Sequence, residues 1–164
     1  MADKEYKNIL IEREGNITFL WLNRPDKRNA MSPDLHFDME DALTWLATDK
    51  ETKVLIIGGK GEAWCAGQDL RLYFRGTQDN PEMRYKANNA SHNWRCELLS
   101  QFPKPTIAMV HGYAFGGRAA AASLSGMDGW ATLLTDRSSP WMSRTAPTTS
   151  WSVRDRPAPR WPHD

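Results

Sequence analysis

KVLIIG, at residues 53–58, is a continuous apolar run that ends in a glycine pair, Gly58-Gly59. Such a run is typical of a strand buried on both faces of a parallel sheet. Upstream, Ser32-Pro33 provides a helix cap followed by proline at the first helical position. Apolar residues then recur at helical spacing down to Asp49, at Leu35, Met39, Leu43 and Leu46. The pattern predicts a helix with one buried face, followed by a buried strand.

A hairpin precedes this helix. Two β-rich runs, KNILIER at 7–13 and ITFLWL at 17–22, are separated by three residues. Gly15 or Asn16 in that connection can take the positive φ that a tight hairpin turn needs. Two antiparallel strands, a helix and a buried strand, in that order, predict an α/β fold with a right-handed crossover.

A second helix and strand follow. Apolar residues along one side predict a helix over Glu82–Phe102, which Pro103 and Pro105 stop. TIAMV at 106–110 reads as another buried strand, and it continues into HGYAFGG at 111–117. A glycine pair at a strand-to-helix junction exposes backbone N–H groups to whatever lies above it.

Composition bounds the class of protein. The 164 residues suffice for one domain, and the formal net charge of +1 gives no indication of nucleic acid or an anionic membrane as partner. No apolar run approaches the ~18 residues that a membrane span needs. The start lacks the pattern of a secretory signal, and two cysteines make neither a disulfide framework nor a four-ligand metal site. We therefore expect a cytoplasmic protein with reduced thiols and no bound metal.

The composition changes after Gly117. Residues 118–164 contain no Lys, Glu, Ile, Phe, Tyr, Asn, Gln or Cys, but they include five Pro and four Trp. This segment shows neither a helical stripe nor alternating strands, so we expect it to be disordered. The chain divides accordingly into residues 1–117 and a low-order tail, 118–164. Translation of a GC-rich gene in a shifted frame would give a similar tail, and that hypothesis stays open.

Three blocks of sequence together resemble a known family. They are NRPDKRNAMS at 23–32, WCAGQDL at 64–70, and KPTIAMVHG at 104–112 with FGG at 115–117. The chain resembles the enoyl-CoA hydratase/isomerase (crotonase) superfamily, and within it the hydroxycinnamoyl-CoA (feruloyl-CoA) hydratase-lyases. The resemblance covers residues 6–117, less than half of the usual family length. It implies a crotonase-like ββα spiral, here truncated.

The resemblance implies an oxyanion hole. In this family two backbone N–H groups stabilise the enolate formed on a CoA thioester, and they match Gln68 and Gly117. Each such donor can contribute ~2.7–4 kcal/mol. Because the main chain would do this work, the identity of side chain 68 should matter little. The alternative is that AGQD and FGG are ordinary turns.

The resemblance also implies a site for CoA. Lys27 and Arg28 could meet the phosphates of the nucleotide, although a solvated basic loop is the alternative. Backbone contacts to adenine and pantetheine are implied near Ala30, Ala66, Asp69 and Leu70. CoA would enter as part of the substrate, with no separate cofactor.

Tyr73 matches a tyrosine that meets the substrate's phenol in the hydratase-lyases, with packing alone as the alternative. The histidines His36, His92 and His111 have no acidic or nucleophilic partner at a recognisable spacing, so we interpret them as surface or structural residues. Nothing near Cys65 marks it as a reactive thiol.

The implied activity is conversion of a feruloyl-CoA-like thioester to an aromatic aldehyde and acetyl-CoA. The family's general acid/base glutamate has no match here, since the last glutamate is Glu97 and neither Asp128 nor Asp136 lies in a matching context. Two alternatives stay open, a generic enoyl-CoA hydratase or isomerase and a non-catalytic, truncated CoA-binding pseudoenzyme. A complete enzyme would form trimer-based homo-oligomers.

Overall fold

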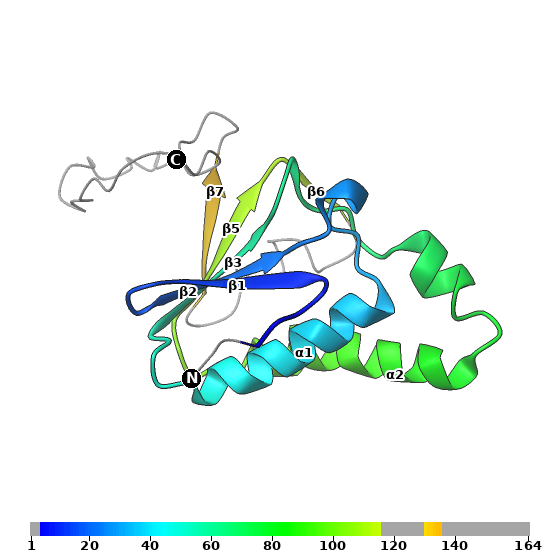
Figure 1. Ribbon diagram of the computed structural model, residues 1–164, viewed down its shortest axis with the longest axis horizontal. Coiled ribbons are helices and arrows are strands. Elements are labelled where there is room, and N and C mark those ends of the chain that lie inside the picture. Colours follow the sequence, from blue (N-terminus) through cyan, green and yellow to red (C-terminus); the bar gives the residue numbers. More distant parts are fainter. Residues whose placement is uncertain (1–3, 116–129, 136–164) are drawn as a thin grey trace, which may run out of the picture.

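The computed structural model describes residues 4–115 and 130–135, which form a mixed α/β unit with a five-stranded sheet (Figure 1). The strands of that sheet are β1 (Ile9–Glu14), β2 (Ile17–Leu22), β3 (Val54–Gly59), β5 (Thr106–His111) and β7 (Trp130–Thr135). A two-stranded sheet contains β4 (Ala63–Cys65) and β6 (Tyr113–Ala114). The helices are α1 (Pro33–Thr48) and α2 (Pro81–His92), with shorter turns η1 (Pro25–Lys27), η2 (Leu70–Arg75) and η3 (Asn93–Leu98).

The large sheet has the order β1-β2-β3-β5-β7. The first two strands form the expected antiparallel hairpin, in which Glu14 pairs with Ile17 and Gly15 takes a φ of 58°. The remaining pairs, β2–β3, β3–β5 and β5–β7, are parallel. The buried strands expected from KVLIIG and TIAMV are thus neighbours near the centre of the sheet.

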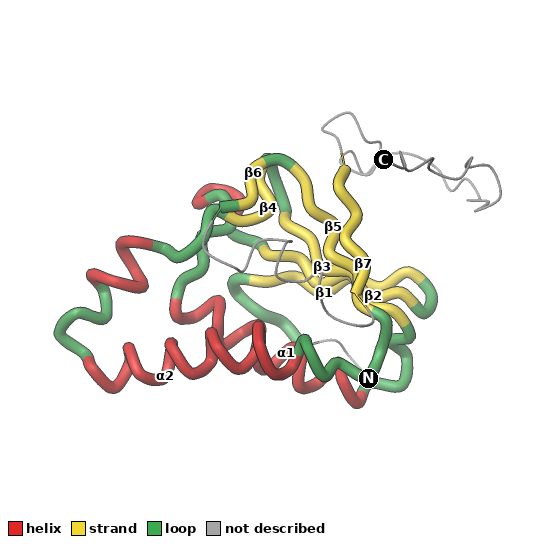
Figure 2. Tube along the Cα trace, turned by 180° about the vertical axis from the view of Figure 1, so that it is seen from behind, coloured by secondary structure: helices red, strands yellow, loops and turns green. Residues whose placement is uncertain are grey.

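The helix expected after Ser32-Pro33 is confirmed as α1. The Ser32 hydroxyl accepts a hydrogen bond from the N–H of Leu35, 3.2 Å away, which caps the first turn. All four apolar positions of the expected stripe are fully buried. Helices α1 and α2 lie along the same side of the sheet (Figures 1 and 2), so the core forms between them and the strands.

The second helix widens along its length. α2 continues directly into η3, a π-helical turn, and together they cover most of the span expected for one helix. Ala87, Ala90 and Trp94 along its inner side are buried, as the apolar spacing predicts. The π-helical turn brings the indole of Trp94 against α1, where it joins the core.

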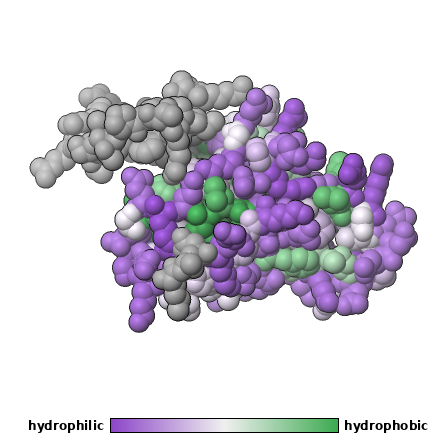
Figure 3. Space-filling model, in the orientation of Figure 1, coloured by the Kyte–Doolittle hydropathy of each residue, from purple (hydrophilic) through white to green (hydrophobic). Residues whose placement is uncertain are grey.

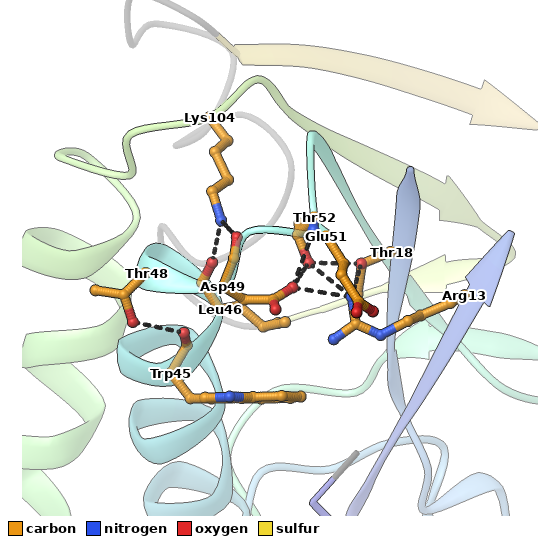
Figure 4. Close-up of polar contacts among 9 residues, drawn as sticks. All are labelled: Arg13, Thr18, Trp45, Leu46, Thr48, Asp49, Glu51, Thr52 and Lys104. Carbon is orange, nitrogen blue, oxygen red and sulfur yellow. Dashed lines mark hydrogen bonds and ion pairs between the residues drawn. The ribbon is translucent and has the colours of Figure 1, made fainter. Parts of the chain in front are cut away.

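A polar network closes the C-terminal end of α1 (Figure 4). The Lys104 ammonium donates to the backbone carbonyls of Leu46 and Asp49, groups that a helix end leaves unpaired. The Asp49 carboxylate accepts from Thr52 and forms an ion pair of 2.9 Å with Arg13. Burial raises the pKa of Asp49, but hydrogen bonds from Thr52 and Arg13 hold it well below its usual range. The network ties β1 and the start of β5 to the helix.

The expectation that the segment after Gly117 forms no regular structure is wrong for Trp130–Thr135. These residues form β7, which pairs in parallel with β5 over its whole length, from Thr106↔Trp130 to His111↔Thr135. WATLLT is compatible with a strand, and the edge of β5 provides the unpaired backbone groups that make it one. Residues 118–129 and 136–164 lie outside the described residues.

The described part of the chain presents a mainly hydrophilic face with separate apolar patches (Figure 3). Among its helices, none combines the length and apolar character that crossing a bilayer requires. Nor do its His, Cys, Asp and Glu side chains form a group of three that could hold a metal ion.

Candidate active site

Two loops that are far apart in the sequence meet at one end of the sheet. One connects β2 to α1 and the other connects β4 to η2. The N–H of Ala66 donates to Arg28 O (2.9 Å), the N–H of Met31 donates to Gly67 O (2.8 Å), and the N–H of Asp69 donates to Met31 O (2.9 Å). The RPDKRNAMS and WCAGQDL blocks are therefore joined by backbone hydrogen bonds into one surface.

The buried side chain of Asn29 stabilises this surface from the interior of the protein. Its side chain is fully buried, and its Oδ1 accepts from the N–H of Arg24 at 2.9 Å. Its Nδ2 donates to the carbonyls of Lys60 (2.9 Å) and Ala63 (2.7 Å). The residue has a φ of 55°, a left-handed conformation that asparagine tolerates better than most residues. In the sequence this loop stands out for its charges, and the only signal of Asn29 is its place in a turn.

The Asp69 side chain organises its loop. Its Oδ1 accepts from the N–H groups of Arg71 (3.1 Å) and Leu72 (2.9 Å) and so caps η2. Its Oδ2 pairs with the Arg24 guanidinium at 3.0 Å, in an ion pair whose side chains are each 11% exposed. Burial raises the pKa of Asp69, but these donors more than offset that effect and leave the pKa below its ordinary value.

The loop presents the backbone N–H of Gln68. Gly67 has a φ of 88°, a conformation that favours glycine, and it turns the chain sharply before Gln68. Gln68 bridges Met31 in parallel fashion, and Met31 bonds to the residues on either side of it. The N–H of Gln68 therefore points away from Met31, and it donates to no acceptor within the described residues. Gly117, the other expected donor, lies outside the described residues.

The side chain of Gln68 points into the protein. Its Oε1 lies 2.9 Å from Nε2 of His36, and its Nε2 lies 3.5 Å from the Ser91 hydroxyl. His36 is fully buried on α1, and its Nδ1 accepts from the indole N–H of Trp94 at 2.9 Å. Burial lowers the pKa of His36 to about 4, so the ring is neutral at neutral pH. This structural role agrees with the sequence-based interpretation, but the contact with Gln68 was not foreseen.

Tyr73 lies beside this pair, on η2. Its side chain is 7% exposed, and its hydroxyl donates to Oδ1 of Asn88 on α2. Its ring contacts His36 edge-on, with centroids 5.6 Å apart. Burial raises the pKa of the phenol, so Tyr73 keeps its proton at neutral pH. Gln68, the expected oxyanion donor, and Tyr73, the expected substrate tyrosine, thus share His36 as a neighbour.

The residues expected to bind CoA lie on or next to the two joined loops, and they differ in exposure. Lys27 and Arg28 are exposed, and the Lys27 ammonium lies 3.2 Å from the Asp26 carboxylate. The carbonyl of Ala30 accepts from the Arg24 guanidinium. The side chain of Leu70 is 74% exposed. Lys27, Arg28 and Leu70 are thus exposed, whereas Asp69 is buried.

Cys65, next to this loop, is buried, and burial raises the pKa of its thiol. A thiol of raised pKa is a poor nucleophile at neutral pH. This agrees with the interpretation of Cys65 as an unreactive residue.

Comparison with known families gives a match over residues 12–125 to the family described as enoyl-CoA hydratase/isomerase. The chain belongs to the enoyl-CoA hydratase/isomerase family. This confirms the resemblance and the expected crotonase-like fold. The match continues beyond Gly117 to residue 125, and the division of the chain at 117/118 stays a prediction.

Relatives within the enoyl-CoA hydratase/isomerase family differ in their described activities. A hydroxycinnamoyl-CoA hydratase-lyase of Pseudomonas fluorescens is 47% identical over 113 residues, which cover 68% of this chain and 41% of that protein. A crotonyl-CoA hydratase of Syntrophomonas wolfei is 33% identical, over 68% of this chain and 42% of its own length. The chain thus spans less than half the length of these curated relatives.

Solved structures show the same fold. A putative enoyl-CoA hydratase from Streptomyces coelicolor A3(2) superposes with a TM-score of 0.67 at 25% identity, covering 82% of this chain and 50% of that one. A putative enoyl-CoA hydratase/isomerase (crotonase) from Legionella pneumophila gives a TM-score of 0.60 at 30% identity, over 70% of this chain and 46% of that one.

Proposed function

We propose that this chain binds a hydroxycinnamoyl-CoA thioester and polarises its carbonyl through the N–H of Gln68. The observation that carries this proposal is that donor itself. It sits on a loop fixed by Gly67, Met31 and Asp69, and the described residues offer it no acceptor. A donor fixed in advance costs no reorganisation when charge develops on a carbonyl oxygen.

A hydrogen-bond donor at the thioester oxygen is needed in both steps of the reaction, hydration and cleavage. In hydration, the hydroxyl of water adds to the β-carbon, the pair of electrons of the double bond moves to the thioester oxygen, and the α-carbon then takes a proton. In the cleavage that follows, the β-hydroxyl loses its proton and the bond between the α- and β-carbons breaks. An aromatic aldehyde leaves, and the enolate of acetyl-CoA takes up a proton. Both steps place negative charge on the same oxygen.

Tyr73 supports an aromatic acyl group as substrate. Its hydroxyl donates to Asn88 and accepts from the Ser91 side chain, which leaves one lone pair that can accept a hydrogen bond from a phenol. The 47% identity to a hydroxycinnamoyl-CoA hydratase-lyase supports the same substrate class. Lys27 and Arg28 would meet the phosphates of CoA at the outer edge of the site.

The described residues favour charge stabilisation over proton transfer. Asp69 is the carboxylate next to Gln68 in the chain, and both of its oxygens are already engaged, by the N–H groups that begin η2 and by Arg24. We therefore propose that the acid/base carboxylate of the full reaction is not Asp69.

Titration with three ligands tests this proposal, using feruloyl-CoA, crotonyl-CoA and free CoA with the purified chain. We expect feruloyl-CoA to bind most tightly and its absorption band to move to longer wavelength, because a hydrogen bond to the thioester oxygen draws electrons along the conjugated chain. Tyr73→Phe should reduce the preference for feruloyl-CoA over crotonyl-CoA by about tenfold, the loss of one buried hydrogen bond.

The alternatives give different results. Equal affinity for feruloyl-CoA and crotonyl-CoA would indicate a generic enoyl-CoA hydratase or isomerase. Equal affinity for free CoA, with no spectral shift, would indicate a protein that holds only the nucleotide. Aldehyde formation from feruloyl-CoA would show that the chain also carries out the proton transfers.

A further inference from the structure

A directional chain of hydrogen bonds runs from Trp94 through His36 to Gln68. An indole N–H can only donate, so Nδ1 of His36, 2.9 Å away, must accept and carry no proton. Because the ring is neutral, its proton is on Nε2, which donates to Oε1 of Gln68 at 2.9 Å. The Gln68 amide is thereby oriented with its NH₂ group toward the Ser91 hydroxyl. The Trp94 N–H, which can only donate, therefore sets the orientation of His36 and then of the Gln68 amide.

Burial makes this chain stiff. His36 and Ser91 are at most 1% exposed, and Trp94 is 7% exposed. Arg95 holds Ser91 from the other side, through its Nη2 on the hydroxyl (2.5 Å) and its Nε on the carbonyl (2.7 Å). A buried polar group that loses its partner costs free energy, so each of these side chains is held in one arrangement.

This series of hydrogen bonds ends at Gln68, whose backbone N–H is the donor in the proposed function. The Gln68 side chain is anchored on the inner side of the loop, and Met31 holds the backbone through the residues on either side. Met31 holds the peptide before Gln68 at its carbonyl end, because its N–H donates to Gly67 O at 2.8 Å, and the side-chain anchor holds the other end of that peptide at Gln68. We therefore expect the identity of side chain 68 to matter more than the main-chain role alone implies.

We propose that His36 is a positioning residue, held in a single tautomer by Trp94, which keeps the Gln68 backbone N–H aimed at the thioester oxygen. This inference rests on the proposed function. It assigns His36 no contact with the substrate and no proton transfer. Its action is on geometry, because a site that is loose by a fraction of an ångström loses much of its stabilisation.

The red shift of bound feruloyl-CoA tests this role, because it reports polarisation of the carbonyl separately from affinity. We expect His36→Phe to lose most of the shift while the Kd rises less than about tenfold, since contacts along CoA are unchanged. His36→Gln can still donate an N–H to Gln68 and should keep most of the shift. The matched control is His92→Phe on the exposed end of α2, which should behave as the unchanged chain.

A second approach works from the other partner. Gln68→Leu keeps the backbone N–H but removes the acceptor of His36, so it should also lose the shift. The double variant His36→Phe/Gln68→Leu should lose no more than either single variant, because both remove one interaction. Circular dichroism and urea unfolding show whether each variant is folded, and only folded variants are compared.

The outcomes separate the two proposals. Single variants that bind feruloyl-CoA with the full shift overturn the positioning role and leave the proposed function standing. Losses of shift that add up in the double variant also overturn it, because they indicate independent effects. A feruloyl-CoA complex of the unchanged chain without any shift overturns the proposed function, and the positioning role with it.

Discussion

Lowering the pH from 6.5 to 4 is expected to reduce the free energy of unfolding by about 3 kcal/mol through His36 alone. The pKa of His36 falls from the usual 6.5 to about 4 in the fold, because burial disfavours the charged ring. Below pH 6.5 the unfolded chain therefore binds a proton at His36, whereas the folded chain binds it only as the pH approaches 4. The stability that comes from keeping His36 neutral is fully present above pH 6.5 and is lost as the pH falls toward 4. Urea unfolding at several pH values measures it.

The control for this prediction is His36→Gln, which does not titrate in this range. The loss of stability between pH 6.5 and 4 should be smaller in this variant by the contribution of the histidine, while carboxylates elsewhere affect both proteins alike. Identical pH profiles for the two proteins would show that His36 is protonated in the folded state as readily as in the unfolded chain.

Asn29→Gly is expected to destabilise the chain by about 4 kcal/mol, because it leaves three backbone groups without their partner. The groups are the N–H of Arg24 and the carbonyls of Lys60 and Ala63. Glycine accepts the φ of 55° at this position, so the loss measures the side-chain hydrogen bonds rather than backbone strain. Denaturant unfolding at neutral pH gives the value.

Arg28→Gly is the matched control, since its neighbour Arg28 also has a positive φ, 48°, but an exposed side chain. This substitution should leave stability unchanged or raise it slightly, because it relieves the backbone and removes no buried contact. Equal losses in the two variants would mean that the loop tolerates no glycine at all, and that Asn29 has no special role.

Local patterns predicted the elements that hold the site. Ser32-Pro33 and the four apolar positions after it predicted α1, and KVLIIG and TIAMV predicted β3 and β5, because capping and burial on a regular spacing act within a few residues. Two of the three sequence blocks lie on the two loops, and hydrogen bonds join those loops. Gly117 as the second donor stays a prediction.

Contacts between distant residues were beyond the sequence. His36 showed only that it lies on the buried side of a helix, whereas its partners are 32 and 58 residues away, at Gln68 and Trp94. Asn29 likewise bonds to carbonyls of the β3–β4 connection, which no local pattern encodes. Strand β7 depended on the free edge of β5, since its own six residues carry too weak a signal.

The Gln68 amide itself provides the most direct measurement of the central claim, that this N–H binds the thioester carbonyl. The chain has three glutamines, so labelling them with ¹⁵N gives three backbone amide peaks. Gln78 and Gln101 already donate to Arg75 O and Glu97 O, at 3.1 and 3.0 Å, and act as internal references. Gln68→Leu assigns the third peak by removing it.

Addition of feruloyl-CoA should move the Gln68 amide proton downfield, since it gains an acceptor, while the reference peaks stay in place. Free CoA, which has no acyl carbonyl, should leave all three unchanged. A Gln68 peak that stays in place at saturating feruloyl-CoA would contradict the account, as would an equal movement with free CoA.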